Sequence, residues 1–179
     1  MATSKTTKLR APREAATAAP SLDRVDRAIL RSLQRDASLS NVALAAKVHL
    51  SPAACLRRVE RLKHGGPIRR IVALLDPVPL ELGMLVVIGV VLDRSTPESF
   101  TAFEKAVHKV PGCLECLVVT GEFDYFVVVR TQDNESFNRL HAQELLYLPG
   151  VRQIRTFVVL KQVLSTTELP IGELARPKR

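Results

Sequence analysis

The chain has 179 residues and a formal net charge of +8, with 26 Lys and Arg against 18 Asp and Glu. A length of this order suits one domain or two small ones. No run of apolar residues is long enough to span a bilayer, and the first residues lack the continuous apolar core of a signal peptide. We therefore expect a cytoplasmic protein with no membrane partner.

The positive charge lies in the first part of the chain. Residues 1–20 are rich in Ala, Thr, Lys and Pro without apolar periodicity, and we interpret them as a disordered basic arm that adds phosphate contacts. Residues 21–76 carry eleven Lys and Arg against five Asp and Glu, residues 77–171 carry eight against eleven, and residues 172–179 form a basic tail. A basic module beside a mildly acidic one is expected when only the first meets a polyanion. Basicity alone would also suit a membrane surface or RNA, but an aromatic content of 4% without Trp removes the case for RNA stacking.

Helical spacing of apolar residues predicts two helices before residue 50. The first follows an apolar stripe from Leu22 to Leu33, with arginines on its other faces. The second is short and follows Ser40-Asn41, with apolar positions at Val42, Leu44 and Val48.

A third helix, expected over Ser51–His64, carries the most informative side chains. Ser51 is a good N-cap, and Pro52 falls at the first helical position, where its missing N–H costs nothing. One face collects the apolar residues, while Arg57 and Arg61 fall on the other, with Arg58 at its margin and Ala53 and Ala54 beside them. Small residues next to arginines let a helix approach the major groove, where Arg pairs with guanine. The alternative is a solvated basic face on an ordinary surface helix.

The sequence after this helix predicts a wing. His64-Gly65-Gly66-Pro67 is a helix stop with turn chemistry. Residues 68–75 are apolar and β-branched enough for a strand that starts with Arg69 and Arg70. Three helices and a strand make a winged helix-turn-helix over residues 21–76, a geometry that favours double-stranded DNA as the partner.

The rest of the chain alternates strands and helices after a Pro-rich linker at residues 77–81. The order over residues 82–171 is βαββαβ, the ferredoxin-like plan of an α+β protein. Helices then cover one face of the sheet, and a second subunit is expected on the aliphatic other face. The predicted elements are a strand at 82–92, a helix from Thr96-Pro97, strands at 113–120 and 125–130, a helix from Asp133 through Leu148, and a strand at 151–164.

A basic winged helix followed by a βαββαβ domain resembles the Lrp/AsnC family, the leucine-responsive or feast/famine regulators. The resemblance covers residues 22 to about 171. One departure is His49, which stands where the helix-turn-helix turn commonly has Gly, so the turn must accept a side chain. The most specific motifs lie at 22–45, 50–62, 114–130 and 148–171.

The resemblance implies a transcriptional regulator with two sites. The Ser51–His64 helix would be the recognition helix, and the DNA-binding residues would be Asn41, Ser51, Pro52, Ala54, Arg57, Arg58, Arg61 and Arg69. The βαββαβ domain would bind a small effector, usually an amino acid, and would assemble the protein into a homodimer and often an octamer on the bacterial or archaeal nucleoid. The effector-binding residues would be Thr120, Gly121, Glu122, Phe123, Asp124 and Tyr125.

The chemistry of this turn fits that role, although Glu122 and Asp124 could equally be plain turn residues. A turn glycine permits close backbone approach, and exposed N–H groups can bind a carboxylate. The carboxylate of Asp124 suits an ammonium group.

Other chemistry is weakly indicated. Cys113 and Cys116 invite a redox or zinc interpretation, but residues three apart in a strand point to opposite faces, and no second CxxC completes a tetrahedral site. We expect structural cysteines, with Cys55 in the core, and no metal or cofactor. No nucleophile elbow, phosphate loop or partnered base indicates an enzyme.

Two further function classes remain open at this level. An architectural protein would coat or bend DNA with little specificity, and random DNA would then compete equally. A sensing subunit of another enzyme would use the helical module for protein contact and would have no DNA affinity.

Overall fold

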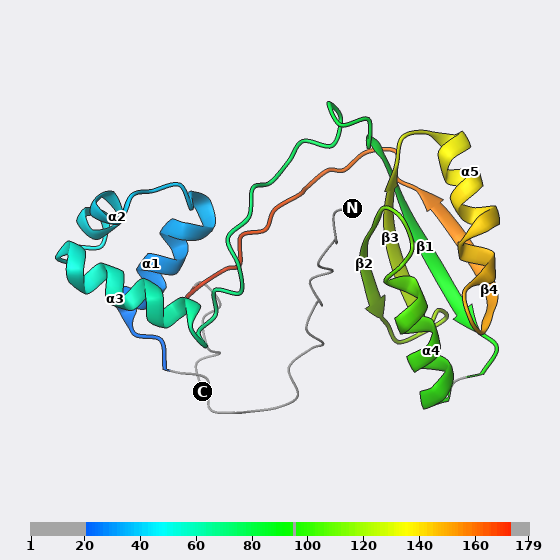
Figure 1. Ribbon diagram of the computed structural model, residues 1–179, viewed down its shortest axis with the longest axis horizontal. Helices are drawn as coiled ribbons and strands as arrows, with labels where there is room; N and C mark the ends of the chain where they lie inside the picture. The colour runs from blue at the N-terminus through cyan, green and yellow to red at the C-terminus, as the bar shows by residue number, and fades with distance from the viewer. Residues whose placement is uncertain (1–20, 95, 173–179) are drawn as a thin grey trace, which may run out of the picture. The chain divides into compact units, whose positions relative to one another are not determined.

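The computed structural model describes residues 21–94 and 96–172 (Figure 1). The chain divides into two compact units, and each is described here by itself. The helical unit comprises the described residues 21–73 and 166–172, and the sheet unit comprises residues 74–94 and 96–165. The predicted basic arm at 1–20 and the end of the predicted basic tail, 173–179, lie outside the described residues.

The predicted helices of the helical unit are confirmed as α1 (Arg24–Arg35), α2 (Asn41–Lys47) and α3 (Pro52–Lys63). Each begins at a side-chain cap: Asp23, Ser40 and Ser51 accept hydrogen bonds from backbone N–H groups of the first turn. The cap predicted at Ser51 is confirmed. The buried core comprises Ile29, Leu30, Leu44, Ala45, Val48, Cys55, Val59 and Leu62. The burial of Cys55 confirms its predicted place.

The structure tests two predictions about α2 and the turn that follows it. Val42, predicted on the apolar face, is 65% exposed, and Ala45 is the buried residue instead. The helix is only seven residues long, so a single face cannot hold every apolar residue. After α2, His49 has φ 55°, the left-handed conformation that usually takes Gly. The turn therefore does accept a side chain, as the sequence requires.

The predicted wing strand is wrong. Residues 68–75 form extended chain outside any strand, because a strand needs a hydrogen-bonded neighbour and the described helical unit consists of helices and irregular chain. Apolar side chains along the segment are accordingly exposed, among them Ile71, Val72, Leu74 and Leu75.

A short C-terminal segment belongs to the helical unit rather than to the sheet. We call residues 166–172 the return segment. Its Leu169 is paired twice with Gln34 of α1: Gln34 Nε2 donates to Leu169 O at 2.9 Å, and Leu169 N donates to Gln34 Oε1 at 3.1 Å. Arg35 pairs with Glu168 at 3.2 Å, and Ile171 packs against the helical core. The unit boundary therefore differs from the predicted domain limit at residue 171.

The sheet unit confirms the βαββαβ order. Its elements are β1 (Met84–Leu92), α4 (Pro97–Val107), β2 (Cys113–Val118), β3 (Tyr125–Thr131), α5 (Asn134–Gln143), the 3₁₀ helix η1 (Leu145–Tyr147) and β4 (Val151–Val158). Within the described residues the strands form a four-stranded antiparallel sheet in the order β2-β3-β1-β4. The last strand ends earlier than predicted, because β1 begins at Met84 and offers no partner for residues 161–164.

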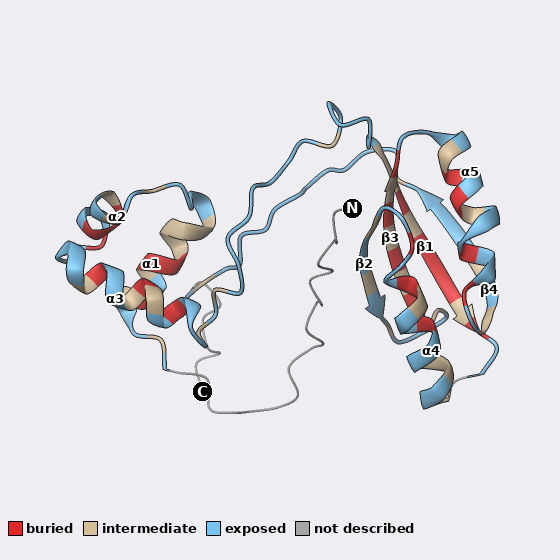
Figure 2. Cartoon of the chain, in the orientation of Figure 1, coloured by how far each residue is buried: buried red, intermediate tan, exposed pale blue. Residues whose placement is uncertain are grey.

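The two faces of this sheet are unlike, and its buried residues lie mainly along β1 and β3 (Figure 2). Alternate residues of β1 and β3, from Val86 to Val129, pack with α4 and α5 into a buried core that includes Phe103 and Phe137. Helices cover this face, as predicted. The opposite face carries apolar side chains that are only partly covered, including Leu117 and Phe157.

Candidate DNA-binding and effector-binding sites

The start of α3 is fixed by two of the predicted DNA-binding residues. The Ser51 hydroxyl accepts from Ala54 N at 3.3 Å, and Asn41 Nδ2 donates to Pro52 O at 2.8 Å. Asn41 thus ties the start of α2 to the start of α3. Ser51, Pro52 and Asn41 lie together at this end, where backbone N–H groups of a helix can meet a phosphate.

Arg57 stands apart from the other arginines of α3. Its side chain is exposed, and no residue in the described part of the chain forms a hydrogen bond or ion pair with it. Ala54 is half-buried one turn earlier. This is the arrangement in which an arginine can reach the edge of a base.

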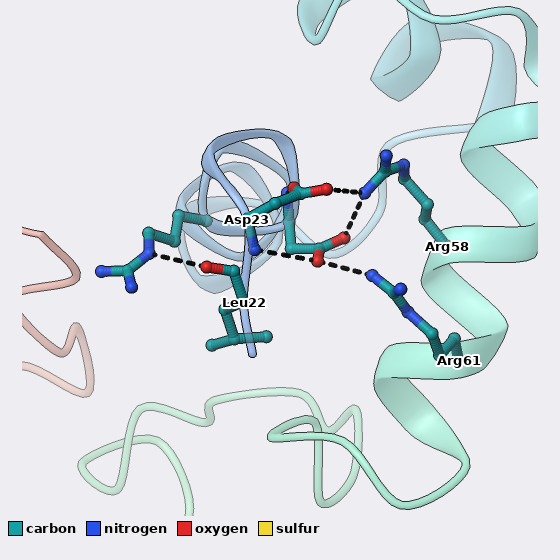
Figure 3. Close-up of polar contacts among 6 residues, drawn as sticks. Leu22, Asp23, Arg58 and Arg61 are labelled. Carbon is teal, nitrogen blue, oxygen red and sulfur yellow. Dashed lines mark hydrogen bonds and ion pairs between the residues drawn. The ribbon is translucent and has the colours of Figure 1, made fainter. Parts of the chain in front are cut away.

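Arg58 and Arg61 are instead held by carboxylates of the first helix (Figure 3). Arg58 Nη1 lies 2.5 Å from Asp23 Oδ2 and 2.8 Å from Asp26 Oδ1, and Arg61 Nη2 lies 2.5 Å from Asp26 Oδ2. Asp26 also accepts from Asp23 N at 3.2 Å, within a capping box that starts α1. The four side chains form one network, which we call the α1–α3 ion cluster.

Burial makes this cluster more than a surface ion pair. The side chain of Asp26 is 1% exposed, against 30% for Arg58 and 55% for Arg61. Breaking a buried pair by removal of one partner costs about 3–5 kcal/mol, whereas an arginine contact with a base contributes about 1–3 kcal/mol. Partial exposure of the arginines lowers the cost of breaking the pair. Leaving the Asp26 carboxylate without its arginines is still less favourable than forgoing an arginine contact with a base.

Protonation equilibria agree with this geometry. The pKa of Asp23 is lowered, first by the hydrogen bond from Asp26 N and then by the Arg58 guanidinium. The pKa of Arg58 is raised by its hydrogen bonds to Asp23 and Asp26. Sequence reasoning missed both carboxylates, although the Asp-x-x-Asp spacing at the start of α1 is the signal of a capping box.

Arg69 lies in the extended segment after α3 and is exposed. With no wing strand to direct it, its place near DNA stays a prediction.

The predicted effector turn joins β2 to β3 and is fixed by backbone bonds. Val119 N donates to Asp124 O at 3.0 Å, and Asp124 N donates to Val90 O at 2.9 Å. The carboxylate of Asp124 accepts from Leu92 N at 2.8 Å. Gly121 adopts φ 118°, and a side chain added there would meet open space. Asp124 therefore has a structural role at the end of β1, with Oδ1 not committed to that bond.

Phe123 folds from the turn onto the open face of the sheet. A Cβ added to Gly89 would lie 2.7 Å from the Phe123 ring, so the glycine makes room for it. The ring lies 5.2 Å from Phe126 and 6.3 Å from Phe157, centroid to centroid. Arg155 stacks above it at 5.7 Å and pairs with Glu122 at 2.7 Å. Gly89 and Arg155 were missed by sequence reasoning, because cross-strand neighbours are distant in the chain.

Tyr125 does not belong with the other five predicted effector residues. Its side chain is buried on the helix-covered face and its hydroxyl donates to Glu104 Oε1 at 3.0 Å. Burial and this bond raise the pKa of Tyr125. Thr120, Gly121 and Glu122 are exposed, and Phe123 and Asp124 are half-buried.

A hollow of the sheet unit lies at the other end of β1, where Leu85 lines it. It is an open groove of about 630 Å³, mostly apolar. Its lining includes Leu80, Leu85, Leu114, Arg130 and Leu160.

The cysteine pair is placed by a β-bulge. The register shifts between Cys113 and Glu115, so Cys113 faces Val129 and Cys116 faces Val127. Both sulfurs therefore lie on the helix-covered face within the strand, which corrects the expectation of opposite faces. Burial, with Cys113 and Glu104 nearby, raises the pKa of Cys116 to about 12. These thiols stay protonated near neutral pH, as structural cysteines do.

Two features are absent from residues 21–94 and 96–172. No cluster of three or more His, Cys, Asp or Glu there could hold a metal ion. No helix in that part of the chain combines the length and apolar character needed to cross a membrane.

Comparisons with known protein families match both units. Residues 22–63 match the AsnC-type helix-turn-helix domain, and residues 85–169 match the Lrp/AsnC ligand binding domain. The leucine-responsive regulatory proteins of Klebsiella pneumoniae and Escherichia coli K12 are each 43% identical over 150 residues, covering 84% of this chain and 92% of theirs.

Solved structures agree. A transcriptional regulator from Neisseria meningitidis, in complex with L-Met, aligns with a TM-score of 0.81 and 36% identity over 87% of this chain and all of that one. An AsnC family regulator from Agrobacterium tumefaciens aligns with a TM-score of 0.80 and 32% identity over 86% and 99% of the two chains. The chain belongs to the Lrp/AsnC family of transcriptional regulators, which are not enzymes: it joins a helix-turn-helix DNA-binding domain to a ligand-binding domain.

Proposed function

We propose that this regulator binds specific DNA sequences through α3 and that an amino acid bound at the β2–β3 turn changes that binding. The single observation that carries the proposal is the exposed Arg57 on a helix whose start is fixed by Ser51 and Asn41. Such a helix can enter the major groove with its first turns. The proposed DNA contacts are Asn41, Ser51, Pro52, Ala54, Arg57 and Arg69, with Arg58 and Arg61 beside them in the α1–α3 ion cluster.

The effector proposal rests on the chemistry of the turn. An amino acid offers a carboxylate and an ammonium group about two bonds apart. The open space at Gly121 lets backbone N–H groups meet the carboxylate, and Asp124 Oδ1 can accept from the ammonium group. Thr120, Glu122 and Phe123 would complete the site. The complex of the Neisseria regulator with L-Met supports an amino acid as the class of ligand.

A second copy of the chain would cover the open face of the sheet. This face carries Phe123, Phe126 and Phe157 beside exposed Leu117, and contiguous exposed apolar side chains are a feature of interaction surfaces. A homodimer would place two recognition helices in major grooves about 34 Å apart, and dimers could assemble further into an octamer on the nucleoid. Effector binding near this interface would then favour one assembly state or helix spacing.

Asp124→Asn is the sharpest single test of the effector site. The amide oxygen of Asn can still accept from Leu92 N, so the turn should keep its structure, while the charge that attracts an ammonium group is lost. We expect unchanged DNA binding without effector and a response to the amino acid weakened by at least tenfold in concentration. A normal response would place the site elsewhere, with the groove around Arg130 as the next candidate. Competition by random DNA tests specificity: equal competition would favour the architectural role.

A further inference from the structure

We propose that Asp26 is a positioning residue that gives the arginines of α3 different roles in DNA binding. It keeps Arg58 and Arg61 bound to α1 when DNA binds, so that base reading by arginine on this helix falls to Arg57. The inference rests on the proposed role of α3 as the recognition helix and assigns roles to individual residues within it.

The three arginines differ in the number of carboxylates that they pair with and in their exposure to solvent. Arg58 is bonded to two carboxylates, Asp23 and Asp26, and is 30% exposed. Within residues 21–94 and 96–172, Arg61 is bonded to Asp26 alone, and it is 55% exposed. Arg57 is exposed, with no such bond in the described part of the chain.

The burial of Asp26 decides which bonds survive contact with DNA. DNA phosphates could draw an arginine away from an exposed carboxylate, since water would then solvate the carboxylate. With both arginines in place, the side chain of Asp26 is 1% exposed, so drawing them away would leave its charge poorly solvated and without a partner. Both arginines therefore stay with Asp26, and their fixed positions hold α3 at one angle on α1.

This division has a measurable consequence in salt. Each cation that neutralises a DNA phosphate releases counterions and adds about 0.9 to the slope of log affinity against log salt. An arginine that remains on Asp26 adds little to that slope. Arg57 on a base would instead set the preference of the protein for that base.

The experiment measures affinity as a function of salt for the full chain, on a random-sequence duplex and on the sequence that the wild-type protein enriches most from a randomised pool. For Asp26→Asn we expect a steeper slope, by about 1–2, and a smaller ratio of selected to random affinity, because two arginines are released toward phosphates. Asp36→Asn is the matched control: it makes the same charge change in the same unit, where the carboxylate bonds, among the described residues, only to Ser38. Its slope should be that of the wild type.

Adjacent arginines supply a second comparison. Arg58→Ala should leave both the slope and the base preference unchanged while weakening binding to both duplexes by a similar factor. Arg57→Ala should relax the preference at one base. If Asp26 had only a structural role, Asp26→Asn would lower the affinity for DNA without changing the salt slope or the ratio of selected to random affinity. That result would overturn the inference. So would a slope reduced by about 1 in Arg58→Ala.

A substitution at a buried position can impair folding, so Asp23→Asn provides an independent route. Asn is also a good N-cap, and of the arginines that the structure describes only Arg58 is bonded to Asp23. Its slope should steepen by a fraction of one unit, and a slope equal to that of Asp36→Asn would contradict the proposal. If the wild-type protein shows no preference for any duplex, the proposed function itself fails; if it shows one and the slopes do not separate, only the assignment to Asp26 fails.

Discussion

Gly89 is the residue at which the sheet and the predicted effector turn meet. Its missing side chain makes room for the ring of Phe123, which lies 2.7 Å from where a Cβ would be. Phe123 is a side chain on a turn, so its ring can move, but it would lose its place beside Phe126 and Phe157.

Gly89→Ala should therefore have two effects: it should destabilise the protein by about 1–3 kcal/mol, and it should weaken the effector response. Chemical denaturation and effector titration measure the two effects. Gly83→Ala is the control, because a Cβ at Gly83 meets nothing within 4 Å. Equal behaviour of the two variants would show that Phe123 is not held by the sheet.

At the same scale, the sequence predicted the recognition helix but not the roles of its arginines. Periodicity placed Arg57 and Arg61 on a face away from the core, and this is correct for the backbone. The partner of Arg61 is Asp26, 35 residues earlier. A long-range ion pair leaves no mark in local spacing, so the α1–α3 ion cluster could be found only in three dimensions.

Among the elements, helix caps link structure to pH. Asp133 caps α5, and the hydrogen bond from Ser136 N lowers the pKa of its carboxylate below the ordinary value of 3.8. A carboxylate with a lowered pKa in the folded state contributes stability above the unfolded pKa and loses it as pH falls through the folded one.

We expect Asp133→Ser, which retains a cap that does not titrate, to change the melting temperature by a constant amount between about pH 5 and 7. Below about pH 4 the difference should shift in favour of the variant, because only the wild-type cap is then lost. Thermal denaturation across this range measures it. A difference independent of pH down to about pH 2 would show that Asp133 does not act through its charge.

The return segment is the element that extends the helical unit. Gln34 makes two hydrogen bonds with the backbone of Leu169, each worth about 0.5–1.5 kcal/mol at most in this exposed setting. Gln34→Ala should destabilise the helical unit by about 1 kcal/mol and speed hydrogen exchange at the Leu169 amide. Thr167→Ala changes the same segment away from these bonds and serves as the control. Unchanged exchange at Leu169 in Gln34→Ala would mean that the segment is held by other contacts.

Elements whose signals are local were predicted well, and elements that need a distant partner were not. A helix start is signalled by residues that lie within one turn of each other. The starts predicted at Ser51-Pro52, Thr96-Pro97 and Asp133 are all confirmed. The strand expected at 68–75 and the end of the strand expected at 151–164 failed for one reason. Both segments are apolar enough for a strand but have no neighbouring strand to pair with.

For the whole molecule, the proposed assembly depends on the open face of the sheet. Phe157 lies on this face, 46% exposed, opposite Val87 on β1. If a second copy covers the face, Phe157→Asp should convert dimers to monomers, since a charge buried without a partner is strongly unfavourable. Sedimentation velocity measures the change.

Leu146→Asp is the control for that experiment, because Leu146 is similarly exposed, at 54%, but lies in η1 outside the sheet. Its assembly should match the wild type. Dissociation by both substitutions, or by neither, would remove the open face from the interface.

The most direct test of the central claim is a DNA-binding titration on the region upstream of the coding sequence, repeated with each amino acid. We predict binding tighter than to random DNA, with an affinity or stoichiometry that one amino acid or a few related ones change. Such a result would show that DNA binding by the helix-turn-helix domain responds to an amino acid bound by the same protein. Binding no tighter than to random DNA, on this region and on duplexes selected from a randomised pool, with no amino acid having an effect, would contradict the account.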